Sequence, residues 1–349
     1  MRESMIHIFS TELKNGKGGI STALVGYVES LRANNIEFEL TTTHSEGNKI
    51  RDFISSCKSA LSVKKGDVCW FHCGPWFSML RKTLLILLCK IQGAKIVIHF
   101  HSRKTHSYLN NVVGRCYLSF LYSIADNFVV LTQWWKSQFS SKGFTHKVVV
   151  SPNPIDQQIL QFIKRNQASP QIKKFFPEKP TIDVLSMARL VEDKGLRETI
   201  SAFQHLPPHY HLHIGGTGPL ENELRQQVNN FGLQDRVHFL GWVDYEAKLE
   251  LFSKTELFCL PSRFDSFGMV YLEALSANIP VVALNFQAIP DVVPEGMGVL
   301  IDNDDPVSLA CAIKEAAEMR DIKGDEYVLS KYSPEPVTKR FLKNVEYSA

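Results

Sequence analysis

Two carboxylates, Asp265 and Glu273, stand eight positions apart in the segment LPSRFDSFGMVYLEALSANIPVVAL, residues 260–284. The segment follows a short apolar run, passes through a polar loop that holds Asp265, and continues as a helical pattern that holds Glu273. The residues SFGM between the acids place backbone N–H groups at the predicted helix start, where unpaired amides and the helix dipole attract an anion. The spacing therefore predicts a phosphate-sized anion site between two acids.

The separation of the two acids suits an elongated ligand. A helix from Phe267 to Glu273 rises about 9 Å, which is about the distance between the sugar and ribose ends of a nucleotide-diphosphate sugar. Asp265 would accept hydrogen bonds from sugar hydroxyls and Glu273 from the ribose diol. The amides of Phe267, Gly268 and Met269 would complete the anion site. The alternative is a loop acid and a helix acid that serve only solubility.

This segment resembles the acid-x7-acid signature of retaining glycosyltransferases of the GT-B fold, family 4 (glycosyl transferases group 1), of the bacterial polysaccharide type. Members usually show E-x-F-G, then E-A, a small residue and G-x-P-V-V-A. Here Asp265 replaces the usual first Glu, and Asn278 replaces the usual Gly before Ile279-Pro280. The resemblance spans nearly the whole chain and is strongest from residue 183 to 302.

A cationic pair follows the apolar run TIDVLSM. Arg189 and Lys194 lie five positions apart in A-R-L-V-E-D-K-G, which matches the family's G-R-L-x-x-x-K-G with Ala188 at the usual Gly. The guanidinium of an arginine and the ammonium of a lysine can stabilise the negative charge that develops on a leaving nucleoside diphosphate. This offers a reason why no metal is needed. The alternative is a surface ion-pair cluster with Glu192 and Asp193.

Two glycine loops are expected to approach the same donor. Gly18 and Gly19 precede a helical pattern, where glycine permits close backbone approach and a helix start favours phosphate. In the family a Gly-Gly loop faces the donor diphosphate. Gly216 lies in GGTGP (215–219), which breaks the G-x-G-x-x-G register and resembles the family's G-x-G-P loop on the nucleotide side. The resemblance also places the base beside the backbone near Val243.

A histidine cluster, HFHSRKTH, contains His99, His101 and His106. Strand alternation puts His99 and His101 on one face, with His101 nearer the carboxyl end. In the family a His after this strand lies near the anomeric carbon, which implies this role for His101; a structural histidine is the alternative. A zinc site lacks third and fourth ligands at short spacing, and DNDD (302–305) is typical of a turn. We therefore expect neither a metal nor another cofactor.

Composition limits the class of protein. A length of 349 residues suits two domains, and 44% hydrophobic with 21% charged residues is typical of a globular protein. A net charge of +3, without basic runs interleaved with aromatics, argues against nucleic acid. Seven cysteines without a C-x-x-C pair favour free thiols in a reducing compartment. No signal-peptide pattern or membrane-spanning stretch is evident, so we expect a cytoplasmic protein.

Apolar runs alternate with helical patterns along the chain, six before and six after a polar stretch at residues 163–180. This order is typical of parallel α/β layers. Together with the resemblance it predicts an α/β protein of the GT-B fold, with two Rossmann-like domains whose parallel sheets face each other across a cleft. The predicted parts are an acceptor-side domain (1–165), a linker (166–180), a nucleotide-sugar-binding domain (181–332) and a C-terminal helix (333–349) that in the family returns to the first domain.

Residues 81–95, RKTLLILLCKIQGAK, combine an apolar stretch with Arg81, Lys82, Lys90 and Lys95. The pattern predicts a buried helix. The second interpretation is an interfacial surface that approaches anionic lipid, which would suit an acceptor anchored in a bilayer. Peripheral contact with the cytoplasmic membrane face is therefore left open.

The resemblance implies a retaining, metal-independent hexosyltransferase. It would move a hexose-type sugar from a nucleotide donor to a hydroxyl of a glycan or lipid-linked glycan, as in polysaccharide or lipopolysaccharide biosynthesis. A UDP-sugar is favoured and a GDP-sugar is the alternative donor. Attack would occur on the front face, with the leaving phosphate as base. A catalytically silent nucleotide-sugar-binding protein and a GT-B nucleotide-sugar epimerase are the alternative functions.

Overall fold

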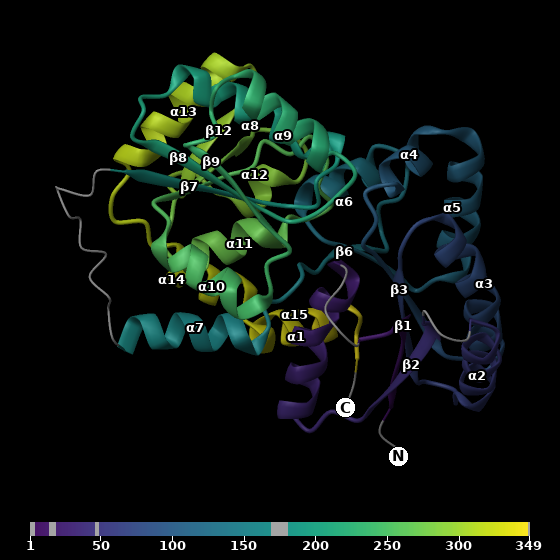
Figure 1. Ribbon diagram of the computed structural model, residues 1–349. Coiled ribbons are helices and arrows are strands. Elements are labelled where there is room, and N and C mark those ends of the chain that lie inside the picture. Colours follow the sequence, from purple (N-terminus) through teal and green to yellow (C-terminus); the bar gives the residue numbers. More distant parts are fainter. Residues whose placement is uncertain (1–3, 14–18, 46–48, 169–180, 348–349) are drawn as a thin grey trace. The chain divides into compact units, whose positions relative to one another are not determined.

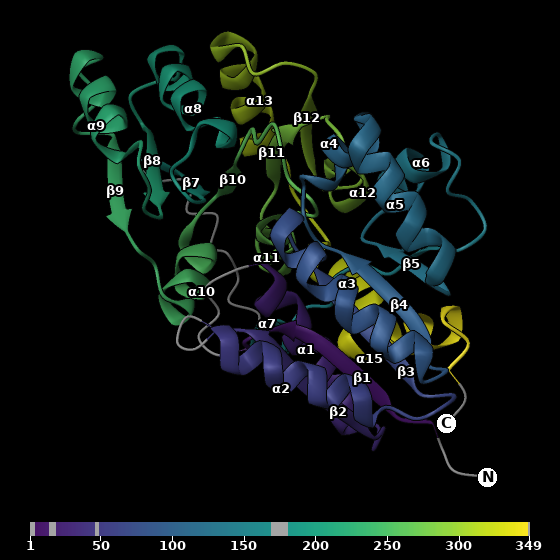
Figure 2. The same cartoon turned by 90° about the vertical axis from the view of Figure 1, so that its right-hand side faces the viewer.

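The computed structural model describes residues 4–13, 19–45, 49–168 and 181–347. Its contacts divide the chain into two compact units (Figures 1 and 2). The first unit comprises Met1–Gln157 and Lys331–Ala349, and the second comprises Gln158–Ser330. Each unit contains one six-stranded parallel sheet, as the alternating pattern predicted.

The sheet of the first unit has the strand order β2-β1-β3-β4-β5-β6. Its strands are β1 (Ile6–Thr11), β2 (Phe38–His44), β3 (Val68–Cys73), β4 (Lys95–Phe100), β5 (Asn127–Val130) and β6 (Val148–Val150). The helices of this unit are α1 (Gly19–Ala33), α2 (Lys49–Ser62), α3 (Trp76–Ile91), α4 (Thr105–Asn110), α5 (Val112–Ile124), α6 (Gln133–Ser140) and α15 (Pro334–Asn344). Every residue of β3 is buried, because helices cover both faces of a parallel sheet.

The C-terminal helix α15 packs into the core of the first unit, beside α1. The ring of Phe341 lies 4.0 Å from that of Trp70 on β3 and 5.7 Å from that of Tyr27 on α1. Aromatic rings at these separations contribute dispersion and quadrupole attraction beyond the burial of apolar area. The last helix is therefore an integral part of the first unit although it follows the whole second unit in sequence.

The sheet of the second unit has the order β12-β11-β10-β7-β8-β9. Its strands are β7 (Ile182–Met187), β8 (Tyr210–Gly215), β9 (Val237–Gly241), β10 (Leu257–Cys259), β11 (Val281–Leu284) and β12 (Gly298–Ile301). The helices are α7 (Gln157–Ala168), η1 (Glu192–Lys194), α8 (Leu196–Ala202), η2 (Phe203–His205), α9 (Glu221–Asn230), α10 (Tyr245–Lys254), α11 (Met269–Ser276), α12 (Ile289–Val292), α13 (Pro306–Glu318) and α14 (Gly324–Tyr332). Parallel strands place their following loops at one sheet edge, which positions the predicted donor-binding residues.

The linker predicted at 166–180 differs in part from the structure. Residues 166–168 are the last turn of α7, and residues 169–180 lie outside the described part of the chain. The compact units divide within α7, at Gln157/Gln158, and within α14, at Ser330/Lys331. The polar side chains of α7 explain the difference, because a helix with buried Ile159 and Ile163 on one face carries many polar residues on the other.

Helix α3 holds most of the apolar stretch that suggested either a buried helix or a lipid surface. It buries Met79, Leu85, Ile86 and Cys89 and exposes four other apolar residues, Phe77, Leu80, Leu84 and Ile91. Three of the four flanking cations are either buried or bound to another residue. Lys82 is buried, Lys90 pairs with Asp126 at 2.9 Å, and Lys95 donates to the carbonyl of Glu346 at 2.9 Å. Within the described residues, no helix has the length and apolar character needed to cross a bilayer.

Candidate functional site

The two residues at the centre of the predicted site, Lys194 and Asp265, form an ion pair in the second unit. Lys194 Nζ donates to Asp265 Oδ1 at 2.7 Å and lies 3.4 Å from Ser262 Oγ. The side chains are 17% and 18% exposed. Asp265 Oδ2 is buried and has no hydrogen-bond partner among the described residues. One carboxylate oxygen is thus fixed by lysine, and the other retains its capacity to accept from a ligand hydroxyl.

Close backbone packing positions this ion pair. Gly195, directly after Lys194, has φ +69°, and a Cβ there would lie 2.4 Å from the carbonyl oxygen of Pro261. The amide of Arg263 donates to the carbonyl of Asp193 at 2.9 Å. The K-G turn after β7 is therefore held against the loop that carries Asp265. Glycine is needed at this point because only it combines the left-handed conformation with so close an approach.

The helix after Asp265, at whose start an anion site was predicted, begins two residues later than predicted. Gly268 is left-handed, with φ +84°, and α11 starts at Met269 rather than at Phe267. A Cβ on Gly268 would lie 2.5 Å from the Tyr271 ring, so the turn is packed tightly. The helical rise from Met269 to Glu273 is about 6 Å, shorter than the predicted distance. The Phe267 side chain is buried, so only the backbone of this residue can contact a ligand.

Glu273 is buried and has a partner that the sequence did not reveal. Lys248 Nζ, from α10, donates to Glu273 Oε1 at 2.7 Å, and the two side chains are 15% and 7% exposed. The ammonium also lies 4.5 Å from the centre of the Tyr245 ring. A buried acid requires a positively charged partner. A buried Glu273 therefore implies a cation beside it. The sequence did not indicate which lysine would supply it.

Arg189, in the loop after β7, is exposed, and its guanidinium has no hydrogen-bond or ion-pair partner among the residues that the structure describes. Glu192 pairs instead with Arg197, at 3.2 Å. The alternative surface cluster of Arg189 and Lys194 with Glu192 and Asp193 therefore does not form in the described part of the chain. Arg189 retains a full set of donors for an anionic ligand.

The GGTGP loop lies directly against the loop that carries Arg189. Gly216 has φ +126°, and a Cβ there would lie 1.9 Å from the carbonyl oxygen of Ala188. The amide of Leu190 donates to the carbonyl of Thr217 at 3.1 Å. Val243 also reaches this loop, with Cγ2 3.1 Å from the Cβ position of Gly215. The structure therefore brings Arg189, Gly216 and Val243 to adjoining loops at the carboxyl ends of β7, β8 and β9.

Three predicted site residues belong to the first unit. Gly18 lies outside the described residues, and Gly19 is the first residue of α1. His101 follows β4, is buried, and has its Nε2 2.9 Å from His72 Nδ1. Burial lowers the pKa of His101 to about 3, and the charge of Lys82 acts in the same direction. His101 is therefore neutral at physiological pH. Its partner His72, from β3, was not predicted.

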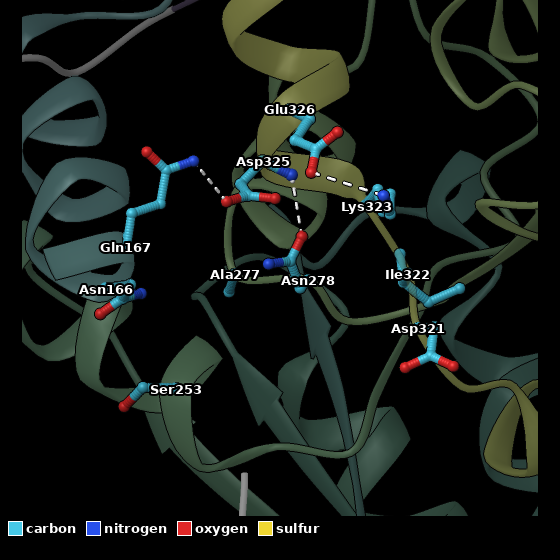
Figure 3. Close-up of a pocket in the computed structure, with 10 residues that line it drawn as sticks. All are labelled: Asn166, Gln167, Ser253, Ala277, Asn278, Asp321, Ile322, Lys323, Asp325 and Glu326. Carbon is cyan, nitrogen blue, oxygen red and sulfur yellow. Dashed lines mark hydrogen bonds and ion pairs between the residues drawn. The ribbon is translucent and has the colours of Figure 1, made fainter. Parts of the chain in front are cut away.

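A polar cavity of about 490 Å³ in the second unit contains none of the predicted site residues (Figure 3). It lies around the turn that ends α11, where Asn278 is left-handed with φ +55°. Glycine adopts this conformation most readily, and Asn tolerates it better than most other side chains. Asn278 Oδ1 accepts from the amide of Asp325 at 2.9 Å, and Gln167 Nε2 donates to Asp325 Oδ2 at 2.8 Å.

Comparison with known proteins finds a family match within the second unit. Residues 168–328 match the family model described as glycosyl transferases group 1. This part, somewhat less than half of the chain, is similar to group 1 glycosyltransferases. The resemblance predicted from the acid-x7-acid segment is thereby confirmed, and assignment to family 4 is consistent with it.

The chain also resembles individual glycosyltransferases over most of its length. It is 27% identical to the putative colanic acid biosynthesis glycosyltransferase WcaL of Escherichia coli (strain K12) over 316 residues, which are 86% of this chain and 72% of WcaL. It spans about half the length of other curated relatives that it matches.

Solved structures confirm the fold. Anabaena HepE, in complex with UDP and glucose, superposes with a TM-score of 0.71 at 16% identity over 99% of this chain and 100% of HepE. Sucrose-phosphate synthase from Thermosynechococcus elongatus gives a TM-score of 0.74 at 18% identity over 98% of both chains. At this identity the likeness shows the fold alone. With the two six-stranded parallel sheets, it confirms the predicted α/β GT-B fold.

Proposed function

We propose that this protein is a retaining glycosyltransferase that moves a hexose-type sugar from a nucleotide-diphosphate donor to a hydroxyl of a glycan or lipid-linked glycan. The observation that carries the proposal is the ion pair between Lys194 and Asp265, with Asp265 Oδ2 unpaired. The pair provides a cation for a diphosphate and an acceptor for a sugar hydroxyl within one contact. Such a combination suits a ligand in which phosphate and sugar are directly linked.

The proposed reaction requires charge stabilisation rather than a protein nucleophile. As the glycosidic bond breaks, the diphosphate gains negative charge, which Lys194 and the unpaired Arg189 would stabilise electrostatically. The acceptor hydroxyl would enter on the face that the diphosphate leaves, and its proton would pass to the leaving phosphate. Asp265 is already paired with a cation, which lowers its reactivity as a nucleophile and favours a role in holding the sugar.

Glu273 would accept hydrogen bonds from the ribose diol, and the backbone near Val243 would adjoin the base. HepE was solved with UDP and with UDP-glucose, which supports UDP as the first nucleotide to test. Thermal shifts with UDP, GDP and their hexose conjugates would rank the donors. A larger shift with UDP-sugars than with GDP-sugars is expected. The opposite order would assign a GDP-sugar instead.

The decisive experiment measures sugar transfer from a radiolabelled donor to glycan acceptors, with wild-type protein and Arg189→Ala. The variant should lose about 100-fold or more in kcat/KM, by analogy with removal of one stabilising donor at a developing charge. Arg225→Ala, at an exposed arginine of α9 in the same unit, is the control and should retain activity. Donor binding without transfer or hydrolysis would identify a silent binder. Conversion of donor without any acceptor would identify an epimerase.

Metal independence is part of the proposal, because Arg189 and Lys194 supply the positive charge that a divalent cation would otherwise supply. Activity should persist in excess chelator. Loss of activity that Mg²⁺ or Mn²⁺ restores would contradict this part alone.

Contact with a membrane surface is a further part of the proposal, and the exposed apolar residues of α3 support it. Full-length protein should float with anionic phospholipid vesicles and less with neutral ones. Phe77→Ser should weaken flotation. Equal recovery with and without vesicles would remove the membrane from the proposal.

A further inference from the structure

Three histidines of the first unit meet in its interior. His72 on β3 and His99 on β4 are partners in the parallel register, and His101 follows two residues after His99 on the same face. The ring centres lie 5.2 Å apart for His72 and His99, 5.0 Å for His72 and His101, and 4.2 Å for His99 and His101. All three side chains are buried.

Of the six ring nitrogens, His72 Nδ1 and His101 Nε2 form a hydrogen bond of 2.9 Å with each other, and the other four are poorly satisfied within the described residues. His72 Nε2 and His101 Nδ1 are buried without a hydrogen-bond partner. Neither nitrogen of His99 forms a hydrogen bond of good geometry, although the backbone of Ser151 lies close enough to favour its charged form. Burial of polar nitrogens without partners is costly. The interior of a sheet usually contains apolar residues at such positions. A bound ligand would supply the partners that these nitrogens lack.

We propose that His72, His99 and His101 form a binding site for a divalent first-row transition metal, with Zn²⁺ as the best-suited ion. One ligand nitrogen from each ring lies within 4.8 Å of the other two. Tetrahedral zinc, with Zn–N of about 2.0–2.1 Å, requires nitrogens about 3.4 Å apart. The nitrogens must therefore approach one another by up to about 1.4 Å for a tetrahedral ion to bind. Three histidines leave a fourth position for water or another small ligand.

The ligands are chemically suited to such an ion. Imidazole nitrogen binds zinc, copper, iron and nickel well, whereas magnesium and calcium prefer oxygen. All three side chains are buried, and a neutral ring is less costly to bury than a charged one. The neutral ring is the form that binds metal. Aromatic packing holds the site in place, since Trp70 stacks on His99 at 5.9 Å and contacts His72 at 4.5 Å.

The positive charge of Lys82 should weaken metal binding, and its removal therefore tests the proposal. Its Nζ donates to the backbone carbonyl of His72 and lies 3.4 Å from Ser78 Oγ. An ammonium beside a divalent cation repels it, and the repulsion is weakly screened in a buried site. Lys82→Met removes the charge and approximately retains the length of the side chain. This variant should therefore bind metal more tightly than the wild type.

The test titrates tag-free, metal-free full-length protein with Co²⁺ and then displaces Co²⁺ with Zn²⁺. The wild type should show the visible absorption of four-coordinate cobalt at one equivalent and a zinc-dependent rise in melting temperature. His72→Gln and His101→Gln should each weaken binding by more than about 10-fold, while Lys82→Met strengthens it. His238→Gln, in a separate histidine group of the second unit, is the control for adventitious binding and should match the wild type.

The wild-type titration alone can overturn the proposal. Absence of one-equivalent cobalt absorption would show that the three rings form a metal-free stack. Equal binding by the wild type, His72→Gln and His101→Gln would place the metal elsewhere, and loss of binding in His238→Gln would locate it in the second unit. These readouts do not depend on glycosyl transfer, so the proposal stands or falls independently of the proposed function.

Discussion

Lys194 and Asp265, 71 positions apart in the chain, form an ion pair of 2.7 Å. The pair joins the turn after β7 to the loop after β10, which are neighbouring strands of the second sheet. Two motifs that are separate in sequence thus form one contact. In the proposed function, Lys194 contacts the phosphate while it stays paired with Asp265, and Asp265 accepts from the sugar through its second oxygen, Oδ2. The pair balances the charges of the site before the donor binds.

Asp265→Glu should change donor selectivity more than stability. The added methylene extends the carboxylate by about 1.5 Å, which moves the acceptor atoms relative to the sugar hydroxyls and relative to Lys194. Relative kcat/KM values across a panel of nucleotide sugars measure the effect, with melting temperature measured beside them. Asp235→Glu, at an exposed acid of the same unit, is the control. Unchanged relative rates in Asp265→Glu would show that this carboxylate does not hold the transferred sugar.

Lys248→Met should destabilise the second unit because it leaves Glu273 buried without its counter-charge. The expected loss is about 3–5 kcal/mol in the free energy of unfolding, the usual cost of removing one partner of a buried ion pair. Lys254→Met is the matched control on the same helix. Its pair with Glu250 is highly exposed, with side chains 69% and 63% accessible, and exposed pairs contribute about 0–1 kcal/mol.

Denaturant unfolding of both lysine variants tests this prediction. The double variant Lys248→Met, Glu273→Gln should recover part of the loss, because the neutral amide no longer needs a cation. Equal unfolding free energies for Lys248→Met and Lys254→Met would show that the ion pair with Glu273 does not stabilise the fold.

Sequence reasoning succeeded where the signal was local. The acid-x7-acid segment and the twelve strands of the described residues could be predicted because each depends on residues that are adjacent or regularly spaced. The start of α11 was misplaced because the left-handed conformation of Gly268 cannot be read from helical periodicity alone. The partners Lys248 and His72 were missed for another reason. Each contacts its predicted residue only because two distinct elements pack together, and a single sequence does not state which ones will do so.

Gly216→Ala should disrupt the loop beside Arg189. The new Cβ would lie 1.9 Å from the carbonyl oxygen of Ala188, and φ +126° lies outside the range that alanine adopts readily. Backbone must shift, so we expect a loss of about 2 kcal/mol or more. Gly232→Ala is the control, because its φ is +65° but no atom lies within 4 Å of its Cβ position. It should cost only about 1 kcal/mol.

Chemical denaturation compares the two glycine variants, and UDP-induced thermal shifts report on the loop itself. A larger loss of stability and a smaller UDP shift are expected for Gly216→Ala. If both variants lose the same stability and retain the same UDP shift, close contact between the GGTGP loop and the Ala188 carbonyl is not required.

Asp67 should make the first unit sensitive to acid. Its buried carboxylate accepts hydrogen bonds from the amides of Met5 and Lys64, both at 3.0 Å, and from His7 at 3.2 Å. Burial alone would raise the pKa of Asp67, but these donors together lower it. The folded state therefore binds its proton at a lower pH than the unfolded state does. The resulting stabilisation is complete above the unfolded pKa of about 3.9 and is lost as pH falls through the folded pKa.

Unfolding free energies measured between about pH 5 and pH 2 test this dependence, since acid loss of such a contribution falls in that range. Asp67→Asn should be less stable than the wild type at neutral pH, by about 1–3 kcal/mol, and should show a smaller decline as pH falls. Glu346→Gln, at a highly exposed acid of the same unit, should decline in parallel with the wild type. Only a group whose pKa differs between the folded and unfolded states alters the slope of unfolding free energy against pH. Parallel curves for wild type and Asp67→Asn would therefore mean that hydrogen bonds to this carboxylate contribute nothing to acid sensitivity.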